Sequence, residues 1–134
     1  MKALKELLSE LTFTCERGNL EKEITAVVYD SRKIVEGCLF VCIMGANFDG
    51  HQAAADAAEK KAAAIIVSQE VELPKQSETT LIRVEDTRYA LAFVSAAWFD
   101  HPAKKLTTIG ITGTKGKTTT TYLVKSILEN AGRK

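Results

Sequence analysis

The chain passes from an apolar run into a glycine-bearing turn, and then into a helix, at Ile109-Gly110-Ile111-Thr112-Gly113-Thr114-Lys115-Gly116-Lys117-Thr118-Thr119. Glycines at positions 113 and 116 allow a tight turn and let backbone N–H groups approach an anion closely. A helix that begins near Lys117 points the positive end of its dipole at the same place. The stretch therefore predicts a strand, a phosphate-binding loop and a helix, in that order.

Within this loop, Lys117 would bring positive charge to the terminal phosphates of a nucleotide, and Thr118 would offer a hydroxyl to a magnesium ion. The spacing departs from the standard phosphate loop, because the residue five positions before Gly116 is Ile111 and not glycine. A helix start rich in capping hydroxyls is the alternative. The predicted ATP-binding residues are Gly113, Thr114, Lys115, Gly116, Lys117, Thr118 and Thr119.

Composition limits the class of protein. The 134 residues are 46% hydrophobic and 26% charged, enough for one core and the beginning of a second. A formal net charge of +1 gives no bulk excess that would favour nucleic acid or an anionic membrane as a partner. No apolar run approaches the roughly 20 residues of a membrane span, so we expect a cytoplasmic protein. Cys15, Cys38 and Cys42 lack metal-ligand spacing and are expected to be reduced thiols.

Helical and strand-like segments alternate ahead of the loop, which predicts an α/β fold. Helices are expected around Leu4 to Leu11, from Gln52 to Lys61 and from Asp86 to Asp100; strands are expected from Ile24 to Tyr29, Cys38 to Ile43, Ala63 to Val67, Leu81 to Val84 and Leu106 to Thr112, with a linker from Ala103 to Lys105. We predict a small mixed-sheet domain with flanking helices over residues 1–102. Residues 103–134 would begin a second domain, truncated after its first strand, loop and helix, because a parallel strand needs neighbours on both sides. A complete small protein that uses this strand as an edge is the alternative.

The loop Thr112-Gly113-Thr114-Lys115-Gly116-Lys117-Thr118-Thr119 resembles that of the Mur ligases and their folylpolyglutamate synthetase relatives. Three upstream stretches are similar to the N-terminal uridine-nucleotide domain of the MurE and MurF types, which the folate relatives lack: Tyr29 to Arg32, Gly37 to Val41 and Gly45 to His51. Two more, Asp86 to Leu91 and Ser95 to Pro102, are closer to the MurE type. The resemblance covers essentially the whole chain. It departs from the family at Lys115, where asparagine is usual, and at Ala46, where a polar or larger residue is usual.

The resemblance implies an ATP-dependent acid–amino acid ligase of peptidoglycan synthesis, with ATP and Mg²⁺ as cofactors. It would add the third, diamino, residue to UDP-N-acetylmuramoyl-L-alanyl-D-glutamate through an acyl phosphate. Residues 103–134 would then start the ATP-binding domain, whose downstream catalytic groups lie outside this chain, so the chain alone is expected to be inactive. Two alternatives stay open: a MurF-type ligase that adds D-alanyl-D-alanine, and a non-catalytic nucleotide-sugar binding module.

Residues 1–102 would hold the uridine end of that substrate. The predicted contacts are Tyr29, Ser31, Gly45, Ala46, Asn47 and Phe48. Without the resemblance, Asp30-Ser31-Arg32 is also typical of a hydrogen-bonded turn, and Arg32 would either pair with Asp30 or meet a phosphate. His51 would either cap the next helix or contact the ligand.

Overall fold

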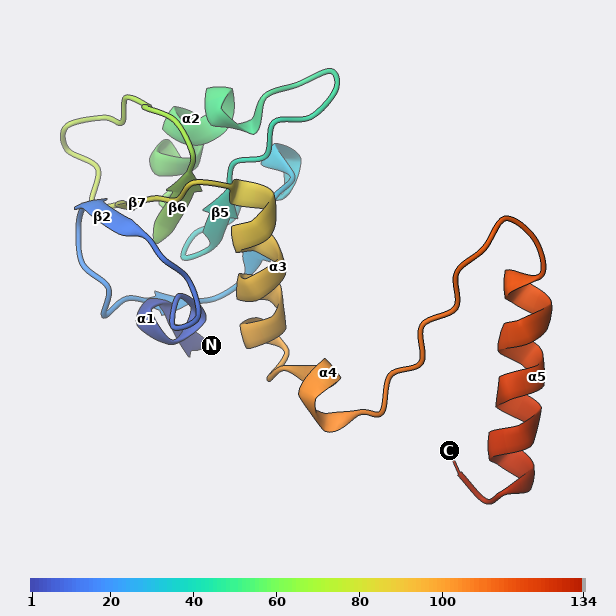
Figure 1. The fold of residues 1–134 in the computed structure, drawn as a ribbon. Coiled ribbons are helices and arrows are strands. Elements are labelled where there is room, and N and C mark those ends of the chain that lie inside the picture. The colour runs from blue at the N-terminus through green and yellow to red at the C-terminus, as the bar shows by residue number, and fades with distance from the viewer. Residues whose placement is uncertain (134) are drawn as a thin grey trace. The chain divides into compact units, whose positions relative to one another are not determined.

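The computed structural model describes residues 1–133 of the chain. The chain divides into two compact units, Met1–Pro102 and Ala103–Lys134 (Figure 1). The division falls at the predicted boundary between residues 102 and 103, while the functions assigned to the two parts stay predictions. None of the helices in the described part of the chain is long and apolar enough to cross a membrane.

The first unit is built on a five-stranded mixed sheet with the strand order β2-β7-β6-β5-β4. The strands are β2 (Thr14–Arg17), β4 (Val27–Val28), β5 (Leu39–Val41), β6 (Ala64–Val67) and β7 (Thr80–Arg83). Strands β4 to β7 are parallel, and β2 pairs antiparallel with β7 at one edge. A separate antiparallel pair joins β1 (Lys2–Ala3) to β3 (Glu23–Ile24).

Helices cover both faces of this sheet. Leu39 and Val41 of β5 pack in one core with α1 (Leu4–Leu7) and α3 (Thr87–Trp98). Phe40, between them in sequence, packs on the opposite face with α2 (Ala54–Glu59). Successive side chains of a strand point to opposite faces, so the continuous apolar run of β5 buries every side chain. The remaining helical segments are η1 (Ser31–Lys33), η2 (Gly50–Ala53), α4 (Pro102–Lys105) and α5 (Lys117–Asn130).

Helix α3 has both a clear start and a clear stop. The Asp86 carboxylate accepts hydrogen bonds from the backbone N–H groups of Arg88, at 2.8 Å, and Tyr89, at 3.1 Å. At the other end, Asp100 and His101 adopt positive φ angles of 59° and 51° ahead of Pro102, which disfavours α geometry in the residue before it. The helix was expected to run to Asp100 and ends two residues earlier, at Trp98.

The α/β fold with a mixed sheet and flanking helices is confirmed, and all three cysteines are free thiols. Several local expectations were wrong. The expected linker is a helical turn, α4, because proline is favoured in the first turn of a helix. The expected first helix ends at Leu7, and the expected strand from Ile24 to Tyr29 is split between two sheets as β3 and β4.

The expected strand from Leu106 to Thr112 is not formed. A strand is stabilised by hydrogen bonds to a neighbouring strand, and no residue in the described part of the chain pairs with this segment. Strands β1 and β2 were not expected. β2 is a short, mostly exposed edge strand without apolar alternation, so only its pairing with β7 reveals it.

Candidate functional site

Two segments distant in sequence meet at the carboxyl ends of β4 and β5. Residues 29–32 directly follow β4, and residues 43–50 follow β5. Because the two strands are parallel neighbours, these segments lie at the same edge of the sheet, the edge where open α/β sheets bind their ligands. They enclose a pocket of about 450 Å³, here called the β4/β5 pocket, which is lined by Tyr29, Asp30, Ser31, Arg32, Ile43, Gly45, Phe48 and Gly50.

Four of the six predicted uridine contacts line this pocket: Tyr29, Ser31, Gly45 and Phe48. Ala46 and Asn47 lie in the same loop but are exposed and do not line it. The pocket adds four residues: Asp30 and Arg32, which flank Ser31, and Ile43 and Gly50, for which the only sequence signal was their place beside the predicted residues. The structure thus brings most of the predicted residues together, while their role in uridine binding stays a prediction.

Asp30 shapes the turn that carries Ser31. Its Oδ1 accepts hydrogen bonds from the backbone N–H of Arg32 and from its Nε, both at 3.0 Å, and its Oδ2 lies 2.8 Å from Nη2 of Arg32. The Arg32 guanidinium lowers the pKa of Asp30 to about 2. Of the two alternatives for Arg32, the structure shows the pairing with Asp30. Since the Arg32 side chain is 86% exposed, the ion pair mainly fixes the turn and adds little stability.

The second segment is a narrow loop, residues 43–50, which leads from β5 into η2. The Gly50 N–H donates to the Ile43 carbonyl at 2.8 Å, and the Gly45 N–H donates to the Phe48 carbonyl at 2.9 Å. A Cβ on Gly50 would lie 2.7 Å from the Ile43 nitrogen, which explains why glycine is needed there. The closed loop leaves Phe48 51% exposed beside the pocket.

Hydrogen bonds also tie the end of this loop to the end of β6. The Ser68 N–H donates to Nε2 of His51 at 3.0 Å, so Nε2 carries no proton. The proton is therefore on Nδ1, which donates to Oδ1 of Asp49 at 2.7 Å. Gln69 Nε2 donates to the other Asp49 oxygen at 2.8 Å. His51 is only 7% exposed and does not line the pocket.

Asp49 rather than His51 caps the helix that follows. Its Oδ1 accepts from the His51 backbone N–H at 3.0 Å. This backbone hydrogen bond, followed by the side-chain hydrogen bonds from His51 and Gln69, lowers the pKa of Asp49. The capping alternative for His51 is therefore wrong, and its ring links the loop to the residue after β6; the ligand-contact alternative stays a prediction.

In the second unit, the glycines of the predicted phosphate loop adopt the backbone that the sequence suggested. Gly113 has a φ of 146° and Gly116 a φ of 77°, values that side-chain-bearing residues rarely adopt. Gly116 is the N-cap of α5, so the predicted helix start at Lys117 is confirmed. Residues 113–119 are exposed, and the strand expected before them is absent.

This segment fits a nucleotide better than a metal ion alone. The first turn of the 14-residue α5 leaves N–H groups without partners inside the helix, and Lys117 adds a positive charge. Within residues 1–133, no three His, Cys, Asp or Glu side chains come close enough to hold a metal ion. A magnesium ion near Thr118 would therefore take most of its ligands from the nucleotide and from water.

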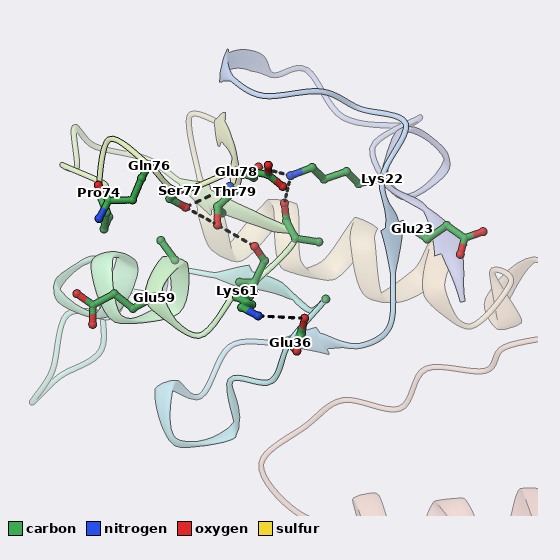
Figure 2. Close-up of a pocket in the computed structure, with 14 residues that line it drawn as sticks. Lys22, Glu23, Glu36, Glu59, Lys61, Pro74, Gln76, Ser77, Glu78 and Thr79 are labelled. Atoms are coloured by element: carbon green, nitrogen blue, oxygen red, sulfur yellow. Dashed lines mark hydrogen bonds and ion pairs between the residues drawn. The ribbon is translucent and has the colours of Figure 1, made fainter.

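A larger hollow of about 690 Å³ lies at the opposite edge, ahead of β5, β6 and β7 (Figure 2). Its two lysines are already engaged: Lys22 donates to the Glu78 carbonyl, and Lys61 lies 3.9 Å from the Glu36 carboxylate. Buried Thr79 donates to the Ala62 carbonyl at 2.8 Å. We therefore treat this hollow as structural.

A third pocket, of about 840 Å³, lies at the carboxyl ends of β6 and β7. Its lining includes three carboxylates, Glu10, Glu85 and Asp86, against a single arginine, Arg83, which pairs with Glu16 at 2.5 Å. This charge disfavours an anionic ligand such as a nucleotide diphosphate. The β4/β5 pocket is the better candidate.

A mostly parallel sheet with a pocket at its carboxyl edge, followed by a glycine turn into a helix, is typical of nucleotide-binding α/β proteins. A sequence-family model described as "Mur ligase family, catalytic domain" matches residues 23–99, which include both segments of the β4/β5 pocket. The chain belongs to the Mur ligase family.

Two relatives, both named UDP-N-acetylmuramoyl-L-alanyl-D-glutamate--2,6-diaminopimelate ligase, illustrate the similarity. The one from Clostridium perfringens is 46% identical over 129 residues, which are 96% of this chain and 26% of the relative. The one from Syntrophomonas wolfei is 44% identical over 131 residues, which are 98% of this chain and 26% of the relative. The chain thus spans about a quarter of the length of these curated relatives.

Solved structures of similar fold include MurF ligases. MurF from Acinetobacter baumannii matches with a TM-score of 0.65 and 28% identity, over 96% of this chain and 27% of that one. A MurF ligase from Thermotoga maritima in complex with ADP matches with a TM-score of 0.55 and 28% identity, over 78% of this chain and 23% of that one. Sequence and structure therefore agree on the family.

Proposed function

We propose that this chain is the N-terminal part of a cytoplasmic, ATP-dependent ligase that adds a diamino acid to UDP-N-acetylmuramoyl-L-alanyl-D-glutamate. The β4/β5 pocket carries the proposal, because it unites most of the predicted uridine contacts in a chain 46% identical to a ligase named for that substrate. The partners would be this UDP-linked dipeptide, ATP, the diamino acid and the remainder of the ligase chain.

The pocket offers the groups that a uridine nucleotide needs. Ser31 can donate a hydroxyl hydrogen bond, and Gly45 permits close approach of the ligand to the backbone. The half-exposed Phe48 ring can stack on the flat base. Ala46 has no polar side-chain atom, so at this position any polar contact with the base falls to backbone groups.

In the second unit, Lys117 and the N–H groups at the start of α5 would hold and neutralise the β- and γ-phosphates of ATP. ATP with magnesium supplies the phosphoryl group that activates the substrate carboxylate for attack by the amine of the diamino acid. This chain would contribute by positioning the substrate. The β4/β5 pocket would bind the uridine end, far from the reacting carboxylate, and the binding energy of that end would help to orient the carboxylate.

Titration calorimetry of the 134-residue chain with UDP-N-acetylmuramoyl dipeptide, UDP and ADP tests this assignment. We expect the dipeptide and UDP to bind at the β4/β5 pocket. Glu59→Gln, in the hollow of Figure 2, should leave both affinities unchanged and serves as the control. Binding of ADP without any binding of the uridine compounds would contradict the assignment of residues 1–102.

A MurF-type ligase is the second candidate, because the similar solved structures are MurF enzymes. That type takes D-alanyl-D-alanine and would use the same uridine pocket. The full-length ligase, assayed with the UDP-linked dipeptide and a diamino acid and then with the UDP-linked tripeptide and D-alanyl-D-alanine, separates the two. We expect turnover with the first pair only.

A further inference from the structure

Hydrogen bonds from Arg88 and Gln69, which lie far from it in sequence, hold the loop of residues 43–50 near both of its ends. Near its start, Nη2 of Arg88 donates to the Met44 carbonyl at 2.8 Å. Near its end, Gln69 and the His51 ring both bond to Asp49. None of Arg88, Gln69 and His51 lines the β4/β5 pocket.

We propose that Arg88 is a positioning residue, which holds this loop in the shape that receives the uridine base. The inference rests on the uridine-binding function proposed above. Arg88 lies in the first turn of α3, where the Asp86 cap fixes the backbone at its own N–H. It thus anchors a projecting loop to a packed helix.

Two successive hydrogen bonds connect Arg88 to residues that line the pocket. Arg88 holds the carbonyl of Met44, which belongs to the same peptide unit as the Gly45 nitrogen. The Gly45 N–H in turn donates to the Phe48 carbonyl at 2.9 Å, and Gly45 and Phe48 both line the pocket. Without the Arg88 side chain, the start of the loop would be free to move, and the Phe48 ring would no longer be held in position.

The hydrogen bonds to Asp49 hold the other end of the loop in place. Asp49 is fixed by Gln69 and by the His51 ring, whose Nε2 is held by Ser68 at the end of β6. A loop held at both ends loses less conformational freedom when a ligand binds, which favours affinity. Arg88 is the more informative residue to change, because it is exposed and its replacement leaves the buried core untouched.

Amide hydrogen exchange of the free chain tests the tie directly. In Arg88→Ala we expect the Gly45 amide to exchange about tenfold faster, since one hydrogen bond to a charged group is lost. The Ile66 amide in β6 should be unchanged. Arg133→Ala, which removes the same charge in the second unit, should change neither. An unchanged Gly45 amide in Arg88→Ala would overturn the proposal.

Calorimetry with uridine and with UDP separates positioning from direct phosphate contact. Arg88→Ala should weaken both ligands by the same factor, about five- to tenfold. Arg88→Lys should recover part of that loss, because an ammonium can also donate to the Met44 carbonyl. Gln69→Met, which releases the other end of the loop, should also weaken both ligands equally.

Weaker UDP binding with unchanged uridine binding would make Arg88 a phosphate ligand and would overturn the proposal. If the unaltered chain binds neither ligand, the proposed uridine function fails, and the exchange rate of Gly45 still decides whether Arg88 holds the loop.

Discussion

Ser31 begins η1 directly after Asp30, whose carboxylate is held by Arg32. This arrangement divides two roles among the three residues. The acid and the arginine fix the turn, and the serine faces the β4/β5 pocket from a backbone that is already shaped. At the scale of single residues, most polar side chains around the proposed site are hydrogen-bonded to one another, so few of them are left to bind a ligand.

Ser31→Ala should weaken UDP binding by about 1 to 3 kcal/mol, the value of a hydrogen bond to a charged group. The measurement is calorimetric titration of the 134-residue chain. Ser9→Ala, at an exposed position outside the pocket, provides the matched control. Unchanged affinity in Ser31→Ala would remove this serine from the site.

Asp49 predicts a dependence of stability on pH. Hydrogen bonds from His51 and Gln69 lower its pKa in the folded chain. An acid whose folded pKa is depressed stabilises the fold above its unfolded pKa, about 3.9, and this contribution is lost as the pH falls through the folded value. The free energy of unfolding of Asp49→Asn should therefore differ most from that of the unaltered chain above about pH 5, and the difference should shrink toward pH 2.

Urea unfolding at several pH values measures this difference. Asp56→Asn makes the same chemical change on the exposed side of α2, and serves as the control. A difference for Asp49→Asn that is the same at pH 2 and at pH 6 would show that the Asp49 charge adds nothing to stability.

At the scale of elements, the site depends on the parallel arrangement of β4 and β5. Their carboxyl ends deliver the turn of residues 29–32 and the loop of residues 43–50 to one edge, although the two segments are separated by the whole of β5 in sequence. The loop closes on itself where Gly50 meets Ile43. A side chain on Gly50 would clash with the Ile43 backbone at this point. Because Gly50 is also the first residue of η2, this close approach constrains both the loop and the start of that helix.

Gly50→Ala should lower the free energy of unfolding by about 1 to 3 kcal/mol, because its Cβ would lie 2.7 Å from the Ile43 nitrogen and 2.9 Å from the Ile43 carbonyl oxygen. Urea unfolding followed by circular dichroism measures the change. Gly110→Ala is the control, since a Cβ there meets nothing within 4 Å. Equal stability of the two variants would show that the loop adapts without cost.

At the scale of the whole molecule, the two units differ in how much they bury. The first unit has a core on each face of its sheet, whereas α5 in the second unit has no buried residue among those described. The chain also spans about a quarter of the length of its relatives. Under the function proposed above, the first unit would bind the uridine end of the substrate, and the ligation reaction would use further groups from the rest of the ligase.

The 134-residue chain should release no phosphate from ATP in the presence of the UDP-linked dipeptide and a diamino acid. The chain spans about a quarter of the length of its relatives, and we expect the remaining groups needed for the reaction to belong to the rest of the ligase. A phosphate-release assay checks this, with the full-length ligase as the positive control. Release that depends on both ATP and the amino acid would contradict it.

Much of this fold could be predicted from sequence, because its signals are local. The apolar runs at residues 38–43 and 63–67, the alanine-rich stretch of α2 and the Asp86 cap of α3 each depend on neighbours within a few positions. The resemblance to the Mur ligases supplied the candidate site, and four of its six predicted uridine contacts line one pocket. The hydrogen bonds made by Arg88 and His51 could not be predicted, since their partners lie 44 and 17 positions away.

The sequence by itself determined the family, the order of the buried strands and helices, and the glycine-capped start of α5. Each of these depends on residue types and on spacings of a few positions along the chain. Only the tertiary structure decided which segments became strands at the margins. β2 exists because Thr14 pairs with Arg83, and residues 106–112 remain unpaired among the described residues. The physical reason is that a strand needs hydrogen bonds from a neighbouring strand, and the identity of that neighbour depends on the whole fold.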